Sequence, residues 1–231
     1  MSLIARPTTA KIVVDPGSGG ISIDDKNLDA CYKATGRFAG LDESGERSLL
    51  FGYWSSSTFL PAVPLTPTAR QRAAGQQWLA CATYLTDLSD VGRTSPIGYQ
   101  GSLRNAESTG GGRDYLGYCP DKPDWNEATS MSCRSPHHGE IFGIGGLSHD
   151  VARATLTSSC VQLVEQVTKS PDLVRDGQLI VDVQVTDMKG KTLNGVTIPK
   201  GSNLQCGVVT GGGRMLQGSL IAIGTEPIPW A

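Results

Sequence analysis

Residues 150–168 read DVARATLTSSCVQLVEQVT, and residues 178–185, shortly after them, read QLIVDVQV. In the first stretch apolar residues recur three and four positions apart around Cys160, which predicts an amphipathic helix. The second stretch is rich in β-branched residues and partly alternates with polar ones, which predicts a β-strand. A cysteine among the apolar residues of the helix suits a disulfide to a neighbouring strand. The two stretches therefore predict a helix tied to a small antiparallel sheet.

Further elements are expected on both sides of this pair. Thr66 and Pro67 followed by residues 68–74 and Gly75 predict a short helix with Thr66 as its N-cap. A helix is also expected over residues 28–39, around Cys31. Strands are expected over residues 78–85, 131–133, 140–144, 206–209 and 215–223. The chain holds 29 glycines and 13 prolines, which favours short strands and many turns over a charged helical bundle.

Six cysteines stand at positions 31, 81, 119, 133, 160 and 206, and six cysteines allow 15 pairings. An internal similarity narrows the choice, because Gln-Gly-Ser-Leu occurs at residues 100–103 and again at residues 217–220. Cys31 precedes Cys81 by 50 residues, and Cys160 precedes Cys206 by 46. If these are two copies of one unit, each copy closes its own bridge. The expected pairs are Cys31–Cys81, Cys119–Cys133 and Cys160–Cys206.

The alternative use of these cysteines is a metal site. Zinc-binding cysteines usually come in Cys-x-x-Cys pairs, and the sequence contains none. Disulfides are the favoured interpretation, and they persist in an oxidising compartment. We expect an α+β fold of two related helix-plus-small-antiparallel-sheet units, each held by a disulfide. The expected division is a flexible lead over 1–27, a first repeat unit over 28–112 and a second over 113–231.

Charge and hydropathy exclude several classes of function. The net charge is −2 and the sequence has no run of Lys or Arg, so neither nucleic-acid binding nor membrane binding through a polybasic segment is expected. No stretch approaches the roughly 20 apolar residues of a membrane span. The start at Met1-Ser2-Leu3 is expected to be vector-derived and to follow a removed segment. Contact with a membrane is therefore expected only through an anchor outside this sequence.

The segment from Cys133 to Phe142 reads CRSPHHGEIF and resembles the signature of the actinobacterial septum formation family. The signature positions fall on Cys133, Pro136, His137, Glu140 and Ile141-Phe142. Further family cysteines match those at 119, 160 and 206, and the resemblance covers residues 115–225. The first copy lacks a Cys-Pro-His counterpart before Cys31, so a full double repeat is in doubt. The resemblance implies an exported or membrane-anchored protein with a part in septum formation or cell division, and it brings no known activity.

The signature also supplies the candidate binding residues, His137, His138 and Glu140. In a strand, residues three apart face opposite sides, so His137 and Glu140 are not expected to act together. The alternative to a functional role is that His137 satisfies backbone groups at a tight turn beside a disulfide. A zinc protease would need two histidines four apart on a helix, and that pattern is missing.

Other candidate sites have ordinary structural interpretations. Ser102 and Ser219 in the two Gln-Gly-Ser-Leu segments read as turn residues, because Gly-x-Ser-x-Gly is missing. Asp124 and Glu127 beside Trp125 read as surface groups more readily than as a glycosidase pair. We therefore expect no catalytic residues, no cofactor and no metal.

Two hypotheses follow. The preferred one is a non-enzymatic extracytoplasmic domain that binds an unknown protein or cell-wall partner. The alternative is a metal-dependent hydrolase of cell-envelope material that uses His137, His138 and His149.

Overall fold

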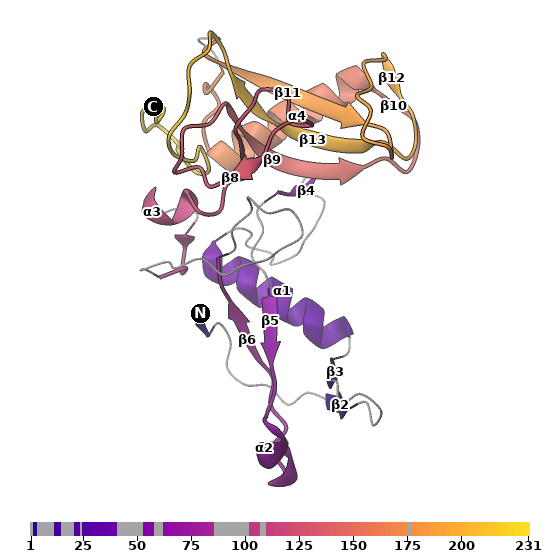
Figure 1. Ribbon diagram of the computed structural model, residues 1–231, viewed down its shortest axis with the longest axis vertical. Coiled ribbons are helices and arrows are strands. Elements are labelled where there is room, and N and C mark those ends of the chain that lie inside the picture. Colours follow the sequence, from indigo (N-terminus) through magenta and orange to yellow (C-terminus); the bar gives the residue numbers. More distant parts are fainter. Residues whose placement is uncertain are drawn as a thin grey trace. The chain divides into compact units, whose positions relative to one another are not determined.

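Figure 1 shows the computed structural model of the chain. It describes residues 2–3, 12–14, 21–23, 25–40, 53–57, 62–85, 102–106, 110–174 and 177–231. The chain forms two compact units, and each is described by itself below. Both combine helices with small antiparallel sheets, so the predicted α+β class is confirmed.

The first unit is built around helix α1 (Asp25–Ala39) and strands β5 (Ala62–Leu65) and β6 (Ala80–Thr83). Its sheet has the order β1-β6-β5, where β1 is Ser2–Leu3, and both pairings are antiparallel. Helix α1 packs against β5 and β6, and Cys31 of α1 forms a disulfide with Cys81 of β6. All four residues of β6, the central strand of this sheet, are buried. A two-stranded hairpin, β2 (Ile12–Val14) with β3 (Ile21–Ile23), belongs to the same unit.

The short helix of the first unit is α2 (Ala69–Ala73), and its N-cap lies two residues later than the predicted Thr66. The cap is Thr68: its hydroxyl accepts the N–H of Gln71, and the side chain of Gln71 accepts the N–H of Thr68. This reciprocal capping box decides between the two threonines, because only Thr68 has a Gln three residues later. Gly75, with φ of 80°, follows the helix as predicted.

The second unit holds a four-stranded antiparallel sheet of order β11-β13-β9-β4. Strands β11 (Leu179–Thr186), β13 (Asn203–Thr210) and β9 (Gly139–Gly146) have eight residues each, and β4 (Ser55–Ser56) adds a short edge. Helix α4 (Arg153–Thr168) packs on the sheet and buries Leu156, Leu163 and Val164. Cys206 lies opposite Val183 in the register and is disulfide-bonded to Cys160 of α4.

Smaller elements complete the second unit: α3 (Gly110–Arg113), β7 (Cys119–Pro120), β8 (Ser130–Met131), β10 (Val151–Ala152) and β12 (Thr197–Ile198). Strand β7 pairs with β8, and β10 pairs with β12. Because β4 comes from residues 55–56, a segment of the N-terminal half of the chain contributes to the sheet of the second unit.

The strand predicted over residues 215–223 is wrong. Among these residues only Leu216 makes strand-like bridges, one to His137 and one to Trp230. Gly218 has φ of 143° and Ala222 has φ of 51°, and neither belongs to an extended strand. The apolar pattern instead buries Leu216, Leu220 and Ile223 from a chain of turns.

The three disulfides are Cys31–Cys81, Cys119–Cys133 and Cys160–Cys206, the pairs that the internal similarity predicts. Disulfides of this kind indicate an oxidising, extracytoplasmic environment. Most of the predicted lead, 1–27, and residues 99–101 before the first Ser-Leu pair lie outside the described residues. Within the described part of the chain, no helix combines the length and apolarity that a membrane crossing requires.

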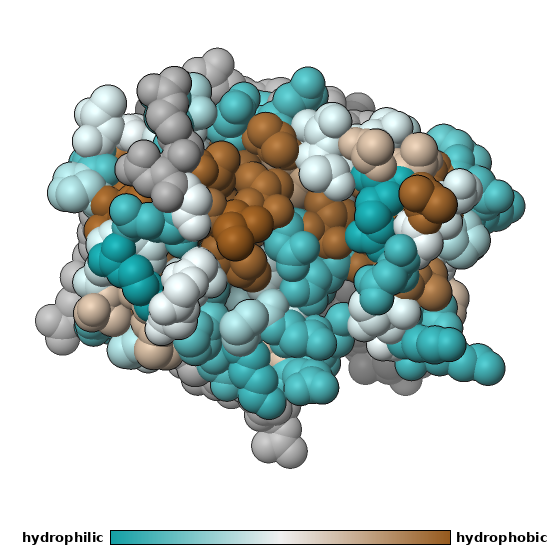
Figure 2. All heavy atoms as spheres, turned by 90° about the horizontal axis from the view of Figure 1, so that it is seen from above, coloured by the Kyte–Doolittle hydropathy of each residue, from teal (hydrophilic) through white to brown (hydrophobic). Residues whose placement is uncertain are grey.

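Several apolar side chains of the second unit remain exposed. Figure 2 shows one face of the molecule, where hydrophobic residues gather among hydrophilic ones. Among the described residues the most exposed large apolar side chains are Val196 at 88% and Met188 at 79%, and both follow β11. Ile180 and Ile144 are about half exposed.

Candidate functional site

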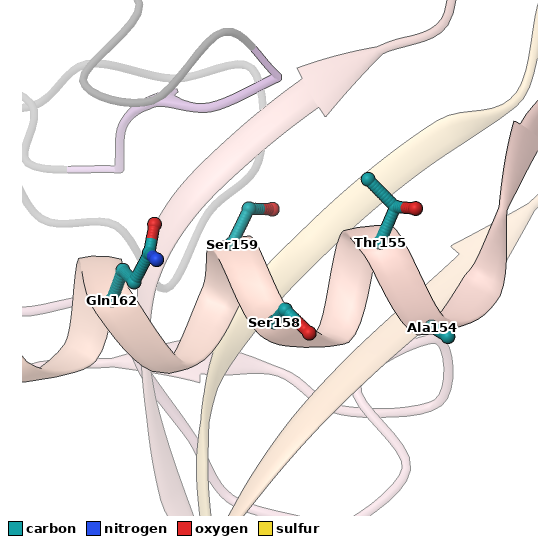
Figure 3. Close-up of a pocket in the computed structure, with 5 residues that line it drawn as sticks. All are labelled: Ala154, Thr155, Ser158, Ser159 and Gln162. Carbon is teal, nitrogen blue, oxygen red and sulfur yellow. The ribbon is translucent and has the colours of Figure 1, made fainter.

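A shallow hollow lies on the outer face of α4 (Figure 3), and it carries little chemistry. Its lining consists of small or neutral polar residues, namely Ala154, Thr155, Ser158, Ser159 and Gln162. The hydroxyl of Ser159 accepts the indole N–H of Trp54 at 2.8 Å and donates to the carbonyl of Leu156 at 2.9 Å. Because this hydroxyl already has both partners and no lining residue titrates, the hollow offers no acid, base or activated nucleophile.

The signature segment is held in place by its backbone at the start of β9. His137 exchanges two backbone hydrogen bonds with Leu216, each 2.9 Å long. The N–H of His138 donates to the carbonyl of Pro120, and the N–H of Ile141 donates to that of Tyr118. The segment therefore lies between the chain around β7 and the turns of residues 215–223, and the side chains of Cys133, His137 and Glu140 are buried there.

Glu140 is the central side chain of this site, and it is fully buried. Its Oε1 accepts the hydroxyl of Ser219, and its Oε2 accepts the backbone N–H of Leu220, both at 2.6 Å. The Sγ atom of Cys133 lies 3.8 Å from Oε1. Both carboxyl oxygens are thus occupied by groups of the protein itself.

Burial raises the pKa of Glu140 to about 7, because a charged carboxylate loses its hydration there. The hydrogen bonds from Ser219 and Leu220 oppose this rise, since both donate to the carboxylate. The negative charge of Asp114 adds to the rise, and the guanidinium of Arg113 reduces it. A carboxyl with this pKa changes its charge near neutral pH.

Gly117 makes room for the cluster. A Cβ atom at this position would lie 2.3 Å from Sγ of Cys133 and 2.4 Å from Oε1 of Glu140. Both distances are far shorter than a van der Waals contact. Glycine is therefore required here by space, since the backbone approaches the carboxylate and the disulfide directly.

Asp114 fixes the turn that supplies the donors to Glu140. Its Oδ1 accepts the backbone N–H of Ser219 at 2.8 Å. The hydroxyl of Ser219 also accepts the N–H of Ile221 at 3.1 Å. Ser219 therefore joins a buried carboxyl to its own turn and does not stand as a free nucleophile.

His137 is fully buried beside the disulfide. Its Nδ1 lies 2.7 Å from the carbonyl oxygen of Ser135, and a carbonyl only accepts, so Nδ1 carries the proton. Its Nε2 is buried without a hydrogen-bond partner. Burial lowers the pKa of His137, so the neutral ring is favoured.

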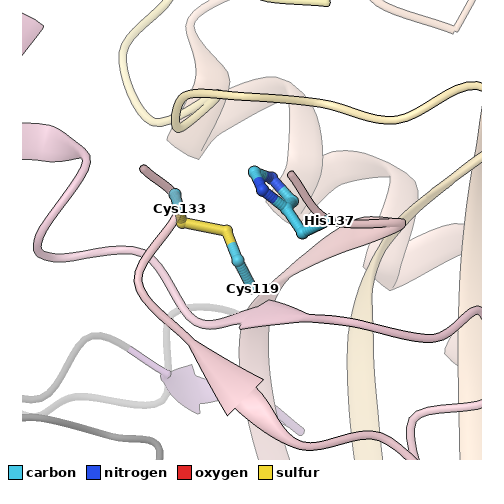
Figure 4. A group of neighbouring side chains, drawn as sticks. All are labelled: Cys119, Cys133 and His137. Carbon is cyan, nitrogen blue, oxygen red and sulfur yellow. A yellow bond between two sulfur atoms is a disulfide. The ribbon is translucent and has the colours of Figure 1, made fainter. Parts of the chain in front are cut away.

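The structure brings His137 and Glu140 to the same disulfide. One ring nitrogen of His137 and the Sγ atoms of Cys119 and Cys133 all lie within 4.8 Å of one another (Figure 4). Oε1 of Glu140 is also 3.8 Å from Sγ of Cys133, so both side chains lie beside this disulfide, whereas alternation along a strand would place them on opposite sides. His137 precedes β9, so regular alternation does not extend to it.

The other two histidines do not join this cluster. His138 is half-buried, and its carbonyl accepts the backbone N–H of Thr210 at 2.9 Å. His149 is exposed, and its ring contacts Ser148 and Tyr53. His138 precedes β9 and His149 follows it, and an eight-residue strand spans about 25 Å. The three histidines of the hydrolase hypothesis therefore do not form one metal site.

Trp125 is also placed differently from its expected position at the surface. Only 5% of its surface is exposed, and its backbone N–H donates to the side chain of Gln184. A buried indole offers no face on which a sugar could stack, whereas Asp124 and Glu127 beside it are exposed.

Sequence reasoning missed Asp114 and Gly117 and took Ser219 for an ordinary turn residue. The repeated Gln-Gly-Ser-Leu segment was the available signal, because it marks the turn that donates to Glu140. No signal marked Gly117, one of 29 glycines in the chain.

Comparison with known proteins identifies no relative: no family model, curated protein or solved structure matches the chain.

Proposed function

We propose that this protein is a non-enzymatic, extracytoplasmic binding domain whose signature residues build the fold and whose exposed loop after β11 contacts a protein partner. The observation that carries the proposal is the burial of the signature. Cys133 is oxidised, His137 and Glu140 are fully buried, and both oxygens of Glu140 accept hydrogen bonds from the chain. A group that must touch a substrate needs an accessible atom, and these side chains have none.

The loop over residues 187–197 is firmly anchored although nearly all of it is exposed. The guanidinium of Arg153 donates to the carbonyls of Val183, Leu193 and Gly195. Asp187 closes the turn, because its Oδ1 accepts the N–H groups of Lys189 and Lys191 at 2.8 and 2.9 Å. Anchoring of this kind lowers the entropy that the loop would lose on binding.

The loop presents apolar side chains and positive charge together. Met188 and Val196 are the two most exposed large apolar residues of the described chain. Lys189 and Lys191 lie between them in the sequence and are exposed as well. We infer a protein surface with an apolar centre and acidic residues around it as the partner, because methionine adapts to irregular apolar contacts and lysines attract carboxylates.

We also propose that the two units are copies of one repeated unit. In each unit a cysteine in the middle of a long helix is bonded to a central strand of the sheet: Cys31 to β6, and Cys160 to β13. The bridges span 50 and 46 residues. This arrangement supports two copies of one unit, of which the second carries the signature.

A place at the cell envelope, anchored or secreted and near the division septum, rests on the disulfides and on the resemblance of residues 133–142. We propose it as the setting in which the loop meets its partner.

The test uses the exported protein as a fluorescent fusion in a dividing actinobacterial host. We expect the wild-type protein to concentrate at septa and the variant Met188→Ser with Val196→Ser to spread over the envelope. The matched control is Ile180→Ser, which removes a half-exposed apolar side chain elsewhere on the second unit.

Circular dichroism of the purified variants checks that the fold is kept. Septal enrichment that survives the double substitution would contradict the role of the loop. Hydrolysis of envelope material by the wild type, lost in a folded Glu140→Gln variant, would contradict the non-enzymatic function.

A further inference from the structure

The cluster of Cys119, Cys133 and His137 has an unexplained feature in the oxidised protein. Nε2 of His137 is a buried acceptor without a donor, and leaving such a group unpaired is unfavourable because it has lost its hydration without gaining a hydrogen bond. The ring cannot turn to repair this without losing the hydrogen bond from Nδ1 to Ser135. One ring nitrogen of His137 and both sulfur atoms lie within 4.8 Å of one another, and an imidazole with two sulfurs is a set of ligand types that a metal ion uses.

We propose that the reduced form of this cluster binds one Zn²⁺ through the thiolates of Cys119 and Cys133 and Nε2 of His137, and that formation of the disulfide releases the ion. This inference does not rest on the proposed binding function. It assigns to the signature segment a second, redox-controlled state.

The donor set suits zinc. Two thiolates and an imidazole are common in four-coordinate zinc sites. The sulfur atoms and a ring nitrogen already lie within 4.8 Å of one another, and ligands of one tetrahedral zinc ion lie about 3.5–4 Å apart. Reduction allows the two sulfurs to separate to that distance. Cys133 and His137 are four residues apart, so a single turn delivers two ligands.

The surroundings of His137 match those of a metal-bound histidine. Such a histidine usually donates its other ring N–H to a carbonyl or carboxylate, which orients the ring and fixes the tautomer. Nδ1 of His137 already donates to Ser135. The fourth position is adjacent to Glu140, whose Oε1 is 3.8 Å from Sγ of Cys133, close to the spacing of two zinc ligands.

The chemical steps balance with one named reductant. Because both sulfurs are buried in the folded protein, the step takes place in a locally opened form, in which a dithiol transfers two electrons and two protons to the Cys119–Cys133 bond and becomes a disulfide itself. The two thiols of the protein then release two protons as they bind Zn²⁺. In the reverse step a small-molecule disulfide accepts the two electrons from the two thiolates and two protons from water, becomes a dithiol, restores the Cys119–Cys133 bond and frees the ion.

The experiment titrates the full chain with a dithiol, maps the bridges by alkylation and mass spectrometry, and measures bound Zn²⁺ at each step. We expect less than about 0.1 Zn²⁺ per oxidised chain. About one Zn²⁺ should bind per chain once Cys119–Cys133 opens while the other two bridges remain. Cobalt as a substitute should give the charge-transfer absorption of thiolate ligands.

Three variants make the result specific. His137→Asn keeps a donor for Ser135 but lacks Nε2, and we expect roughly tenfold or greater loss of affinity. Cys119→Ser with Cys133→Ser should bind no Zn²⁺ at the same reductant concentration. The matched control, His138→Asn, changes the neighbouring half-buried histidine and should bind like the wild type.

Three results would overturn the proposal. The first is that the reduced wild type binds no Zn²⁺, and the second is that His137→Asn binds it as tightly as the wild type. The third is that Cys119–Cys133 never opens before the other two bridges.

Discussion

In the first unit, a turn over residues 102–106 begins with the Ser-Leu pair that ends the first Gln-Gly-Ser-Leu segment. The hydroxyl of Ser102 accepts the N–H of Arg104 at 3.1 Å, and the carbonyl of Leu103 accepts the N–H of Ala106 at 3.3 Å. Asn105 has φ of 52° and donates its N–H to Phe38, the next-to-last residue of α1.

In the second unit the corresponding turn has the same contacts. The hydroxyl of Ser219 accepts the N–H of Ile221 at 3.1 Å, and the carbonyl of Leu220 accepts the N–H of Ile223 at 3.2 Å. Ala222 has φ of 51° and donates to Val167, the next-to-last residue of α4. Both turns thus tie the chain to the end of the disulfide-bonded helix.

The difference lies in what the second turn holds. Its serine and the following N–H bind the buried carboxyl of Glu140, which lies against Gly117 and Cys133. Among the described residues, no carboxyl binds Ser102 or Leu103 of the first turn. The comparison teaches that the second turn differs by holding Glu140, whose pKa burial raises to about 7, so this turn is expected to respond to pH.

The largest expected loss of stability comes from removing the disulfide that ties each long helix to its sheet. It tests whether the two disulfides stabilise their units to the same extent. Replacement of Cys160 and Cys206 by Ala, and separately of Cys31 and Cys81, should each lower the free energy of unfolding by about 4 kcal/mol, because the loops have similar length. Denaturant unfolding combined with hydrogen exchange separates the units. Ser158→Ala on the exposed side of α4 is the control and should cost less than about 0.5 kcal/mol. A much smaller loss of unfolding free energy on removal of one disulfide than of the other would contradict the equivalence of the two units.

The next largest expected effect is a change in the stability of the second unit with pH. The folded-state pKa of Glu140 is raised to about 7, so the folded state binds more protons than the unfolded state between about pH 4.5 and 7. Stability should therefore fall by about 3 kcal/mol as pH rises from 5 to 9. Urea unfolding at both values measures this fall.

Glu140→Gln should remove most of the dependence, since a neutral amide can accept from Leu220 and donate to Ser219. An unchanged pH dependence in this variant would show that Glu140 does not cause it.

A smaller effect tests the space around the carboxyl. Gly117→Ala should cost about 2 kcal/mol, because its Cβ would overlap Cys133 and Glu140. Gly146→Ala is the matched control, since a Cβ there would make only an ordinary contact of 3.8 Å with Ser202. Thermal unfolding of the two variants provides the comparison, and equal losses would contradict the close packing of Gly117.

The smallest effect compares the turns directly. An alanine at positive φ costs about 1–2 kcal/mol, whereas asparagine tolerates this conformation. Ala222→Gly should therefore stabilise the second unit by about 0.5 kcal/mol after the entropy of glycine is subtracted. Asn105→Gly should change the stability of the first unit by less than Ala222→Gly changes that of the second. A larger gain at Asn105, measured in the same urea titrations, would contradict the equivalence of the turns.

Local patterns predicted most of the regular structure. The helix at 150–168 and the strand at 178–185 differ from α4 and β11 by at most three residues at either end, because apolar periodicity reports a buried face directly. The segment 215–223 failed because its apolar residues serve a series of turns around Glu140. The Ser55–Ser56 strand could not be found from two serines, since its pairing with β9 is set by the tertiary structure.

The resemblance singled out Cys133, His137, His138 and Glu140 but not their arrangement. His137 and Glu140 lie beside the disulfide of Cys133, His138 does not join them, and the enclosure of Glu140 depends on Gly117 and Ser219, which lie on other segments. Sequence spacing alone cannot show that two distant turns enclose a carboxyl.

The most direct test of the account is peptide mapping of the native protein under non-reducing conditions. We predict the pairs Cys31–Cys81, Cys119–Cys133 and Cys160–Cys206, with one bridge inside each helix–sheet pair and one against Glu140. A crossed pair such as Cys81–Cys133, or free thiols in the native protein, would contradict both the equivalence of the units and the structural role of the signature.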